Sequence, residues 1–356
     1  MTPAAPRALV CLLPGLGDAM IASPVIRAVV EAGYSADAMT MLAPVAEYAT
    51  ALGVFGRVFH VPLLENGAAA GAIVELRRRH YKLVLIPAPA PRWQYAATAW
   101  AIGGETTIIH RYGGSSSAIA RLARFTEVPL RGGHRIAENM RLAEAAGLRC
   151  TGDASYLVPA AWKSAKRDSE LLGLHTGSMS YKGNEQKRWP LERFARVAND
   201  YAGKGWRVRA FFGPNEANDA STFAGMAPAA EIVQRPLSEA ARALSECAAV
   251  LANDSGIAHL AAGLGVTTLV LFGMTDPTRC KPIGPAVALR PSSCPPCFDE
   301  GMRRFECVRN IGYRCLLADI ELEYVERAIA TSLETVPPVQ FESAGPLALY
   351  GRVRSS

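Results

Sequence analysis

The sequence predicts an α/β protein made of two doubly wound domains, and three observations support that prediction. Strand-like apolar runs alternate with helix-like segments along most of the chain, as in βαβ units around a parallel sheet. The pattern loosens over residues 146–169 and then starts again. A length of 356 residues is sufficient for two domains. We therefore expect an N-terminal domain over 1–160, a C-terminal domain over 161–335 and a tail over 336–356.

In the first half, short apolar runs predict strands, and longer runs with helical spacing predict helices. The expected strands are Ala8–Pro14, Thr40–Ala43, Val58–Val61, Leu83–Ile86 and Thr106–Ile109. The expected helices are Asp18–Ala32, Trp93–Ile102, Gly113–Arg124 and Arg135–Ala146.

The second half repeats the alternation. The expected strands are Leu171–His175, Arg207–Phe212, Glu231–Gln234, Ala248–Ala252 and Thr267–Phe272. The expected helices are Leu191–Tyr201, Asn215–Phe223, Ser238–Cys247 and His259–Leu264. Ligands of such sheets bind at the carboxyl ends of the strands, so the turns after the strands are where chemistry is expected.

Composition limits the classes of function. Hydrophobic residues make up 50% of the chain and charged residues 20%, which excludes general disorder. The net charge of +6 favours acidic ligands without demanding nucleic acid, and we expect no nucleic-acid partner. The first residues, Met1–Val10, lack the order of a signal peptide, so a cytoplasmic location is expected.

The most informative turn lies within Val250–Leu264. A buried strand runs into Asn253, Asp254 and Ser255, whose side chains can cap a helix, and Gly256 then leaves room for a ligand beside the backbone. Unpaired N–H groups and the helix dipole make such a turn suitable for binding an anion such as a phosphate. An ordinary capped helix explains the same residues.

The first turn of the chain carries Gly15, Gly17 and Asp18 directly after an expected strand. It lacks the third glycine of dinucleotide-binding folds, which disfavours a nicotinamide enzyme. Asp18 at a helix start suits two roles, a first-turn acid that favours the helix dipole or a general base for an acceptor hydroxyl.

Two further turns gather polar groups. The segment after His175 contains Ser178 and Lys187, a hydroxyl and a cation suited to a phosphate or pyrophosphate. Glu216 follows another strand and can accept hydrogen bonds from ribose hydroxyls or serve as a helix N-terminal acid.

Taken in order, these motifs resemble the bacterial heptosyltransferase family, glycosyltransferase family 9. The resemblance extends from about residue 8 to residue 330, and Cys294–Phe298 is also similar to that family. It rests on Gly17-Asp18, Lys187–Pro190, Asn253–Leu260 and Leu271–Pro277. It implies a GT-B fold, in which two Rossmann-like domains face a central cleft. It also implies inverting transfer from a nucleotide-activated sugar, usually ADP-heptose, to the inner core of lipopolysaccharide.

The resemblance also implies roles for particular residues. Asp18 would be the catalytic base, Lys187 would neutralise the leaving diphosphate, and Glu216 would bind the ribose. No carboxylate cluster suggests a catalytic metal, so catalysis is expected to need no cofactor. For His259, a packing role inside the helix stays open beside a phosphate contact. The expected donor-binding residues are Gly17, Ser178, Glu216, Asp254, Ser255, Gly256, Ile257, Ala258, His259 and Thr275.

Several alternatives explain the same residues. The acceptor can be a glycan, a lipid-linked sugar or a protein, and a lipid-linked acceptor implies peripheral contact with the inner membrane. A nucleotide-sugar epimerase or hydrolase on the same fold is one alternative function. A non-catalytic nucleotide-sugar-binding subunit is another.

Four late cysteines form a separate group, namely Cys294, Cys297, Cys307 and Cys315. Four thiolates can hold Zn²⁺ or iron in a tetrahedral structural site. Reduced cysteines packed in a loop, or a redox-labile pair, explain the same residues.

Overall fold

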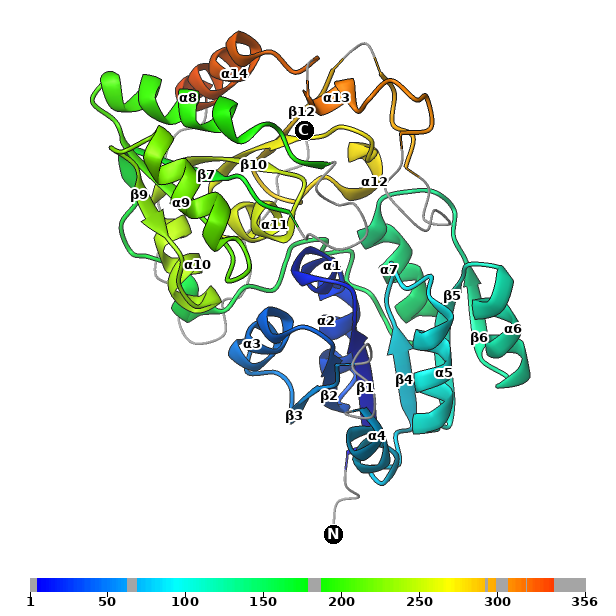
Figure 1. Ribbon diagram of the computed structural model, residues 1–356. Helices are drawn as coiled ribbons and strands as arrows, with labels where there is room; N and C mark the ends of the chain where they lie inside the picture. The colour runs from blue at the N-terminus through cyan, green and yellow to red at the C-terminus, as the bar shows by residue number, and fades with distance from the viewer. Residues whose placement is uncertain are drawn as a thin grey trace. The chain divides into compact units, whose positions relative to one another are not determined.

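The computed structural model describes residues 5–62, 69–178, 187–291, 294–298, 307–317 and 319–335. The chain divides into two compact units, Met1–Pro159 and Ala160–Ser356. Each unit contains one six-stranded sheet with helices packed on it (Figure 1). The tail expected over 336–356 lies outside the described residues.

The sheet of unit 1 is parallel throughout, with the strand order β3-β2-β1-β4-β5-β6. Its strands are β1 (Arg7–Leu12), β2 (Ser35–Thr40), β3 (Arg57–His60), β4 (Leu83–Ile86), β5 (Thr106–Arg111) and β6 (Thr126–Pro129). Its helices are α1 (Leu16–Ile21), α2 (Ser23–Glu31), α3 (Ala43–Ala51), α4 (Ala69–Arg77), α5 (Trp93–Ile102), α6 (Gly114–Leu122) and α7 (Arg135–Ala145). The direction of winding reverses between β1 and β4, where ligands of doubly wound folds bind.

Unit 2 has the same topology, with the strand order β12-β11-β10-β7-β8-β9. Its strands are β7 (Asp168–His175), β8 (Arg207–Phe211), β9 (Glu231–Val233), β10 (Cys247–Asn253), β11 (Thr267–Leu271) and β12 (Ala286–Leu289). Its α-helices are α8 (Leu191–Gly203), α9 (Ala217–Met226), α10 (Leu237–Ser245), α11 (Gly256–Gly263), α12 (Pro277–Cys280), α13 (Arg314–Leu317) and α14 (Leu322–Thr335). A 3₁₀ turn at Ala160–Trp162 precedes them. The reversal point here lies between β7 and β10.

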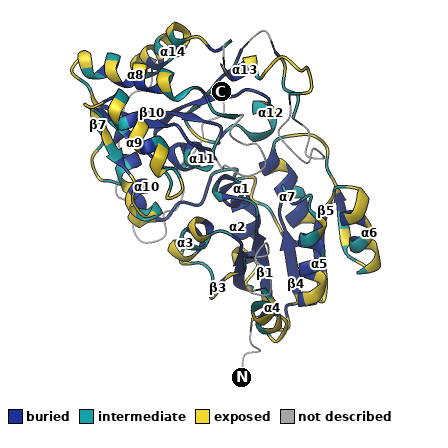
Figure 2. Ribbon diagram, viewed as in Figure 1, coloured by how far each residue is buried: buried dark blue, intermediate teal, exposed yellow. Residues whose placement is uncertain are grey.

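The central strands are mostly apolar and buried because helices cover both faces of each sheet. All four residues of β4 and all five of β11 are buried. Figure 2 shows the same distribution, with buried strands beneath helices whose outer faces are exposed. The polar turns at the strand ends therefore lie on rigid supports.

The single helix expected over Asp18–Ala32 is two helices, α1 and α2, which meet at Ala22. Pro24 lies in the first turn of α2 and has no N–H to donate into a preceding turn. The break follows from that missing donor. Asp18 consequently lies on a short, separate helix.

The strand expected over Thr40–Ala43 is wrong, because the structure has β2 at Ser35–Thr40 and begins α3 at Ala43. The buried carboxylate of Asp37 interrupts the apolar pattern in the sequence. In the fold, Asp37 is fully buried and accepts hydrogen bonds from Arg79 Nε at 2.6 Å and Tyr81 Oη at 2.8 Å. Pairing makes an acidic residue acceptable inside the strand.

Candidate functional site in unit 2

Four neighbouring strands of unit 2 end in turns that carry expected site residues. In sheet order these strands are β11, β10, β7 and β8. The turns after them hold Thr275, Asp254, Ser178 and Glu216 respectively. Because parallel strands end at one edge of the sheet, residues from four separate motifs lie along a single edge.

Asn253 ties three of these segments together. Its side chain is fully buried at the end of β10. Asn253 Nδ2 donates to the Thr176 carbonyl at 2.7 Å, and Asn253 Oδ1 accepts from the Trp189 N–H at 2.9 Å. Both polar groups of the amide are thereby satisfied. Asn253 fixes the loop after β7 and the segment that carries Lys187 to the end of β10.

Lys187, Asp254 and Thr275 form the centre of this edge. Lys187 Nζ lies 2.6 Å from Asp254 Oδ2, and Thr275 Oγ1 donates to the same oxygen at 2.8 Å. Burial would raise the pKa of Asp254, but the Lys187 ammonium and the Thr275 hydroxyl hold it below its usual value. Asp254 is therefore an ionised carboxylate that orients the Lys187 ammonium.

Glu216 is held at the end of β8 by two donors. Glu216 Oε2 accepts from the Gly213 N–H at 2.7 Å, and Glu216 Oε1 accepts from Arg188 Nη2 at 3.1 Å. Arg188 also donates to the Ser178 carbonyl at 2.6 Å and to Asp219 Oδ2 at 2.9 Å. The carboxylate thus has a fixed position from which its remaining lone pairs can accept hydroxyl protons.

Gly177 makes room for that carboxylate. A Cβ at Gly177 would lie 2.6 Å from Glu216 Cδ, closer than atoms of packed side chains approach. A side chain at this position would therefore displace the Glu216 carboxylate from the place that it occupies beside the glycine.

The N-terminus of α11 has the arrangement expected of an anion site. Ser255 is the N-cap, and its hydroxyl accepts from the Ala258 N–H at 3.4 Å. That bond engages the Ala258 N–H, one of the groups expected to contact a ligand. Gly256 and Ile257 lie in the first turn, where backbone N–H groups point out of the end of the helix. His259 is buried in the same helix and lies near enough to Asp254 to lower the pKa of that carboxyl. A packing role and a ligand contact both fit this position of His259.

Two expected site residues lie in unit 1. Gly17 and Asp18 belong to α1, which begins where the chain leaves β1. Gly17 is buried, Asp18 is half-buried, and Asp18 is in the first turn of the helix. They occupy the carboxyl end of β1, at the reversal point of that sheet.

The four late cysteines are connected to the Thr275 turn. The Cys297 N–H donates to the Met274 carbonyl at 2.9 Å, and a Cβ at Gly273 would lie 3.4 Å from Cys315 Sγ. Burial raises the pKa of Cys315 to about 11, and the charges of Cys294, Cys297 and Cys307 contribute to this shift. These segments therefore support the turn that places Thr275 against Asp254.

The cysteines do not form a coordination shell in this structure. Among the residues that it describes, no group of three or more His, Cys, Asp or Glu side chains is arranged to hold a metal ion. Burial opposes ionisation of Cys307, yet backbone N–H groups hold its pKa below the usual value. One of them, from Ile311, lies 3.4 Å from the sulfur. The structural metal stays a prediction.

Asn253, Arg188 and Gly177 are the residues of this edge that the sequence analysis did not assign to the site. Asn253 was noted as a capping residue and as part of the motif Asn253–Leu260, and Arg188 lies next to the assigned Lys187. For Asn253 a signal was present, because an Asn side chain at the end of a strand can hydrogen-bond the backbone of the turn that follows.

Together, the two sheets with their reversed winding define the class of protein, a two-domain GT-B fold. Residues 93–306 match the family model of glycosyltransferase family 9 (heptosyltransferase), which is more than half of the chain. The chain belongs to this family.

A curated relative is lipopolysaccharide heptosyltransferase 1 of Pseudomonas aeruginosa, which is 36% identical over 93 residues. The alignment covers 26% of this chain and 26% of that protein, so the chain spans about a quarter of the relative's length. Lipooligosaccharide heptosyltransferase 2 of Haemophilus influenzae is another curated relative, which is 30% identical over 105 residues. That alignment covers 27% of this chain and 30% of that protein.

Solved structures agree with the GT-B fold. The ADP-heptose lps heptosyltransferase II of E. coli has a TM-score of 0.69 at 17% identity, covering 92% of this chain and 98% of that one. A family 9 glycosyl transferase from Veillonella parvula has a TM-score of 0.72 at 20% identity, and the match covers 94% of this chain and 99% of that one. TibC, described as a dodecameric iron-containing heptosyltransferase, has a TM-score of 0.60 at 12% identity. The match covers 93% of this chain and 76% of that one.

No helix in the described part of the chain is long and apolar enough to cross a membrane.

Proposed function

We propose that this protein is an inverting glycosyltransferase that moves a heptose from ADP-heptose to a hydroxyl of a lipopolysaccharide core or a related glycan. The observation that carries the proposal is the ordered edge of unit 2, where Lys187, Glu216 and the N-terminus of α11 come from neighbouring strands. A cation and backbone N–H groups suit a diphosphate, and a fixed carboxylate suits a ribose. Membership of family 9 supports the same assignment.

In the proposed reaction, Asp18 takes the proton of the acceptor hydroxyl. The acceptor oxygen then attacks the anomeric carbon from the face opposite the diphosphate, and the bond between that carbon and the diphosphate oxygen breaks. Lys187 and the N–H groups of Gly256 and Ile257 stabilise the negative charge on the departing ADP. Asp254 orients Lys187, and Glu216 holds the ribose. The step uses protein groups only.

Unit 1 would bind the acceptor and unit 2 the donor. We further propose that the enzyme works in the cytoplasm with peripheral contact at the inner membrane, where a lipid-linked acceptor would be found. Zn²⁺ or iron at Cys294, Cys297, Cys307 and Cys315 would stabilise the support of the Thr275 turn and take no part in transfer.

A thermal-shift panel of ADP-, GDP- and UDP-linked sugars tests the donor assignment first. A selective rise in melting temperature with ADP-heptose is expected. A shift with another nucleotide would discard this donor and retain the fold, and no shift with any compound would favour a role without nucleotide-sugar chemistry.

The catalytic assignment is tested with Asp18→Asn and a heptose-deficient lipopolysaccharide core as acceptor. Transfer, followed by mass spectrometry, should fall at least about a thousandfold while the donor affinity stays within about twofold. Glu31→Gln is a matched control, since Glu31 is an exposed acid at the end of the neighbouring helix α2.

Equal loss of donor binding and transfer in Asp18→Asn would contradict its role as a base. Donor turnover without any transferred sugar would instead indicate an epimerase or hydrolase. Binding without turnover, with every acceptor supplied, would indicate a non-catalytic subunit.

A further inference from the structure

Helix α5 has an unusual composition for a helix on the outside of a sheet. Its ten residues, Trp93–Ile102, include no charged side chain. One face packs on the sheet, yet Trp93 and Trp100 on the opposite face are 50% and 51% exposed. They are seven residues apart, two helical turns, and so project from the same side about 10 Å from each other.

The neighbouring helices extend this apolar face. Helix α5 packs against α4 on one side and α6 on the other. Val74 on α4 is 48% exposed and Leu122 at the end of α6 is 70% exposed. We name the surface formed by Val74, Trp93, Trp100 and Leu122 the outer face. Isolated exposed apolar residues need no explanation, but exposed apolar residues on three helices that pack side by side are a candidate interaction site.

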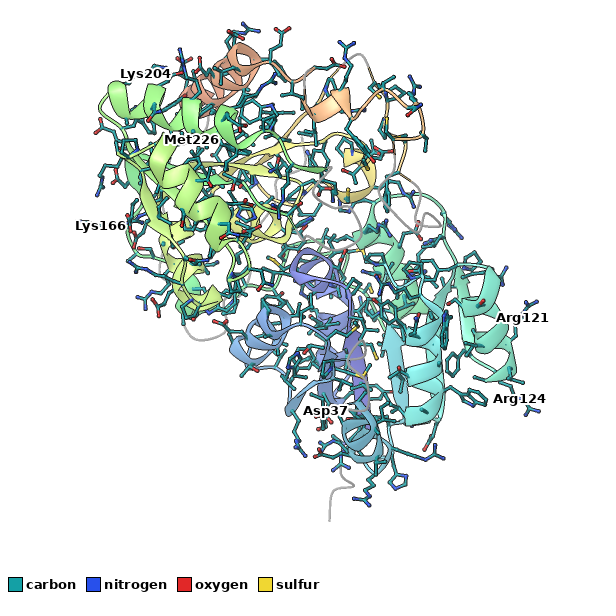
Figure 3. The ribbon with its side chains drawn as sticks, in the orientation of Figure 1. Asp37, Arg121, Arg124, Lys166, Lys204 and Met226 are labelled. Carbon is teal, nitrogen blue, oxygen red and sulfur yellow. The ribbon has the colours of Figure 1, made fainter. Side chains whose placement is uncertain are left out.

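Arginines border the outer face where the helices end. Arg77 and Arg78 are exposed at the end of α4, and Arg77 Nη1 donates to the Ala101 carbonyl at the end of α5 at 3.0 Å. Arg121 and Arg124 are exposed at the end of α6 and point away from it (Figure 3). The border is thus strongly basic on both sides of Trp100.

We propose that the outer face binds the surface of an anionic lipid bilayer. Tryptophan is favoured at membrane interfaces, leucine can enter the acyl boundary, and arginines attract anionic headgroups. This inference deepens the peripheral contact suggested under the proposed function by naming the surface that makes it. It does not depend on the donor, the acceptor or the transfer step.

The charge on the outer face disfavours a second copy of the chain as its partner. In a two-fold dimer the same face lies on both sides of the interface. Each copy would then bring its own border of arginines to the interface, and the two like-charged borders would repel each other. The three helices contain a single carboxylate, Glu75, which already pairs with Arg57 at 2.5 Å. A bilayer that contains phosphatidylglycerol supplies the missing negative charge.

Vesicle co-sedimentation without donor or acceptor tests the proposal. The full chain is mixed with phosphatidylcholine vesicles that either contain or lack phosphatidylglycerol. Binding to the anionic vesicles that weakens as salt is added is expected. Vesicles with brominated acyl chains should quench tryptophan fluorescence, and Trp93→Phe with Trp100→Phe should remove most of that quenching while binding persists.

Two double variants separate the apolar and the charged contributions. Trp100→Gln with Leu122→Gln should weaken binding about tenfold or more. Arg121→Gln with Arg124→Gln should weaken it by roughly fivefold for each arginine and flatten its salt dependence. The controls are Val287→Gln, at a 42% exposed valine of unit 2, and Arg196→Gln on α8.

The positions changed are exposed, so melting temperatures close to that of the unaltered protein are expected and confirm folding. The proposal is overturned if the unaltered protein ignores anionic vesicles at low salt, or if either double variant binds as well as the controls. A dimer in sedimentation equilibrium that Trp100→Gln with Leu122→Gln abolishes would assign the outer face to a second copy. None of these results alters the prediction for Asp18→Asn.

Discussion

Asn253→Ala should be among the most damaging single substitutions in unit 2. It removes the acceptor of the Trp189 N–H and the donor to the Thr176 carbonyl, both of which lie in buried residues. An unpaired buried polar group costs roughly 1–3 kcal/mol, so the two together predict a loss of about 2–6 kcal/mol in the free energy of unfolding. Urea denaturation followed by circular dichroism measures this loss.

Asn199→Ala provides the matched control. Asn199 Nδ2 also donates to a backbone carbonyl, that of Met226 at 2.8 Å, but the side chain is exposed on α8. Water replaces the lost partner there, so a change below about 1 kcal/mol is expected. The reasoning is refuted if the two variants lose the same stability. If Asn253 holds the Lys187 segment in place, donor affinity should also fall in Asn253→Ala and not in Asn199→Ala.

The remaining predictions concern packing, acid stability and electrostatics. Gly177→Ala should displace the Glu216 carboxylate and weaken donor binding about tenfold by calorimetry, and Glu216→Asp in the same chain should restore part of it by making room. Burial lowers the pKa of His110 to about 4 from 6.5. On acidification the imidazole of His110 is therefore protonated first in the unfolded chain. The free energy of unfolding should fall by up to about 3 kcal/mol as the pH drops from 6.5 to 4. Urea denaturation at a series of pH values measures this loss, which should be absent in His110→Phe. In Lys187→Met, the pKa of Asp254 should rise, because burial is then opposed only by the weaker effects of Thr275 and His259, and a carboxyl NMR titration measures this rise. The depressed pKa makes the Asp254 charge stabilise the unaltered fold above the unfolded pKa, and this stabilisation is lost as pH falls through the folded pKa. The stabilising contribution should be smaller in Lys187→Met.

The sequence predicted the sheet strands best where they are buried on both faces. The strand expected over Leu83–Ile86 has the same bounds as β4, because a strand covered on both faces shows an unbroken apolar run in the sequence. Asp37 concealed the true extent of β2, since its partners Arg79 and Tyr81 lie more than forty residues further along the chain. Local patterns cannot show a charge that a distant residue compensates.

The turns that carry the candidate site could be located from the sequence, but not their mutual contacts. Lys187 and Asp254 were assigned separately, as a leaving-group cation and a turn residue, and their ion pair follows only from the strand order of the sheet. Arg188 and Gly177 were missed for the same reason. Each acts on Glu216, which comes from a different strand, and sequence spacing does not report which strand ends are neighbours.

The shared strand order of the two units has a consequence for how such a protein changes over generations. Each unit contains its own reversal point, between β1 and β4 in one and between β7 and β10 in the other. The amino-acid sequence of the loops at either point can change while the strands beneath them keep their packing. The ligand specificity of one unit can thus change during evolution while the ligand specificity of the other unit is retained.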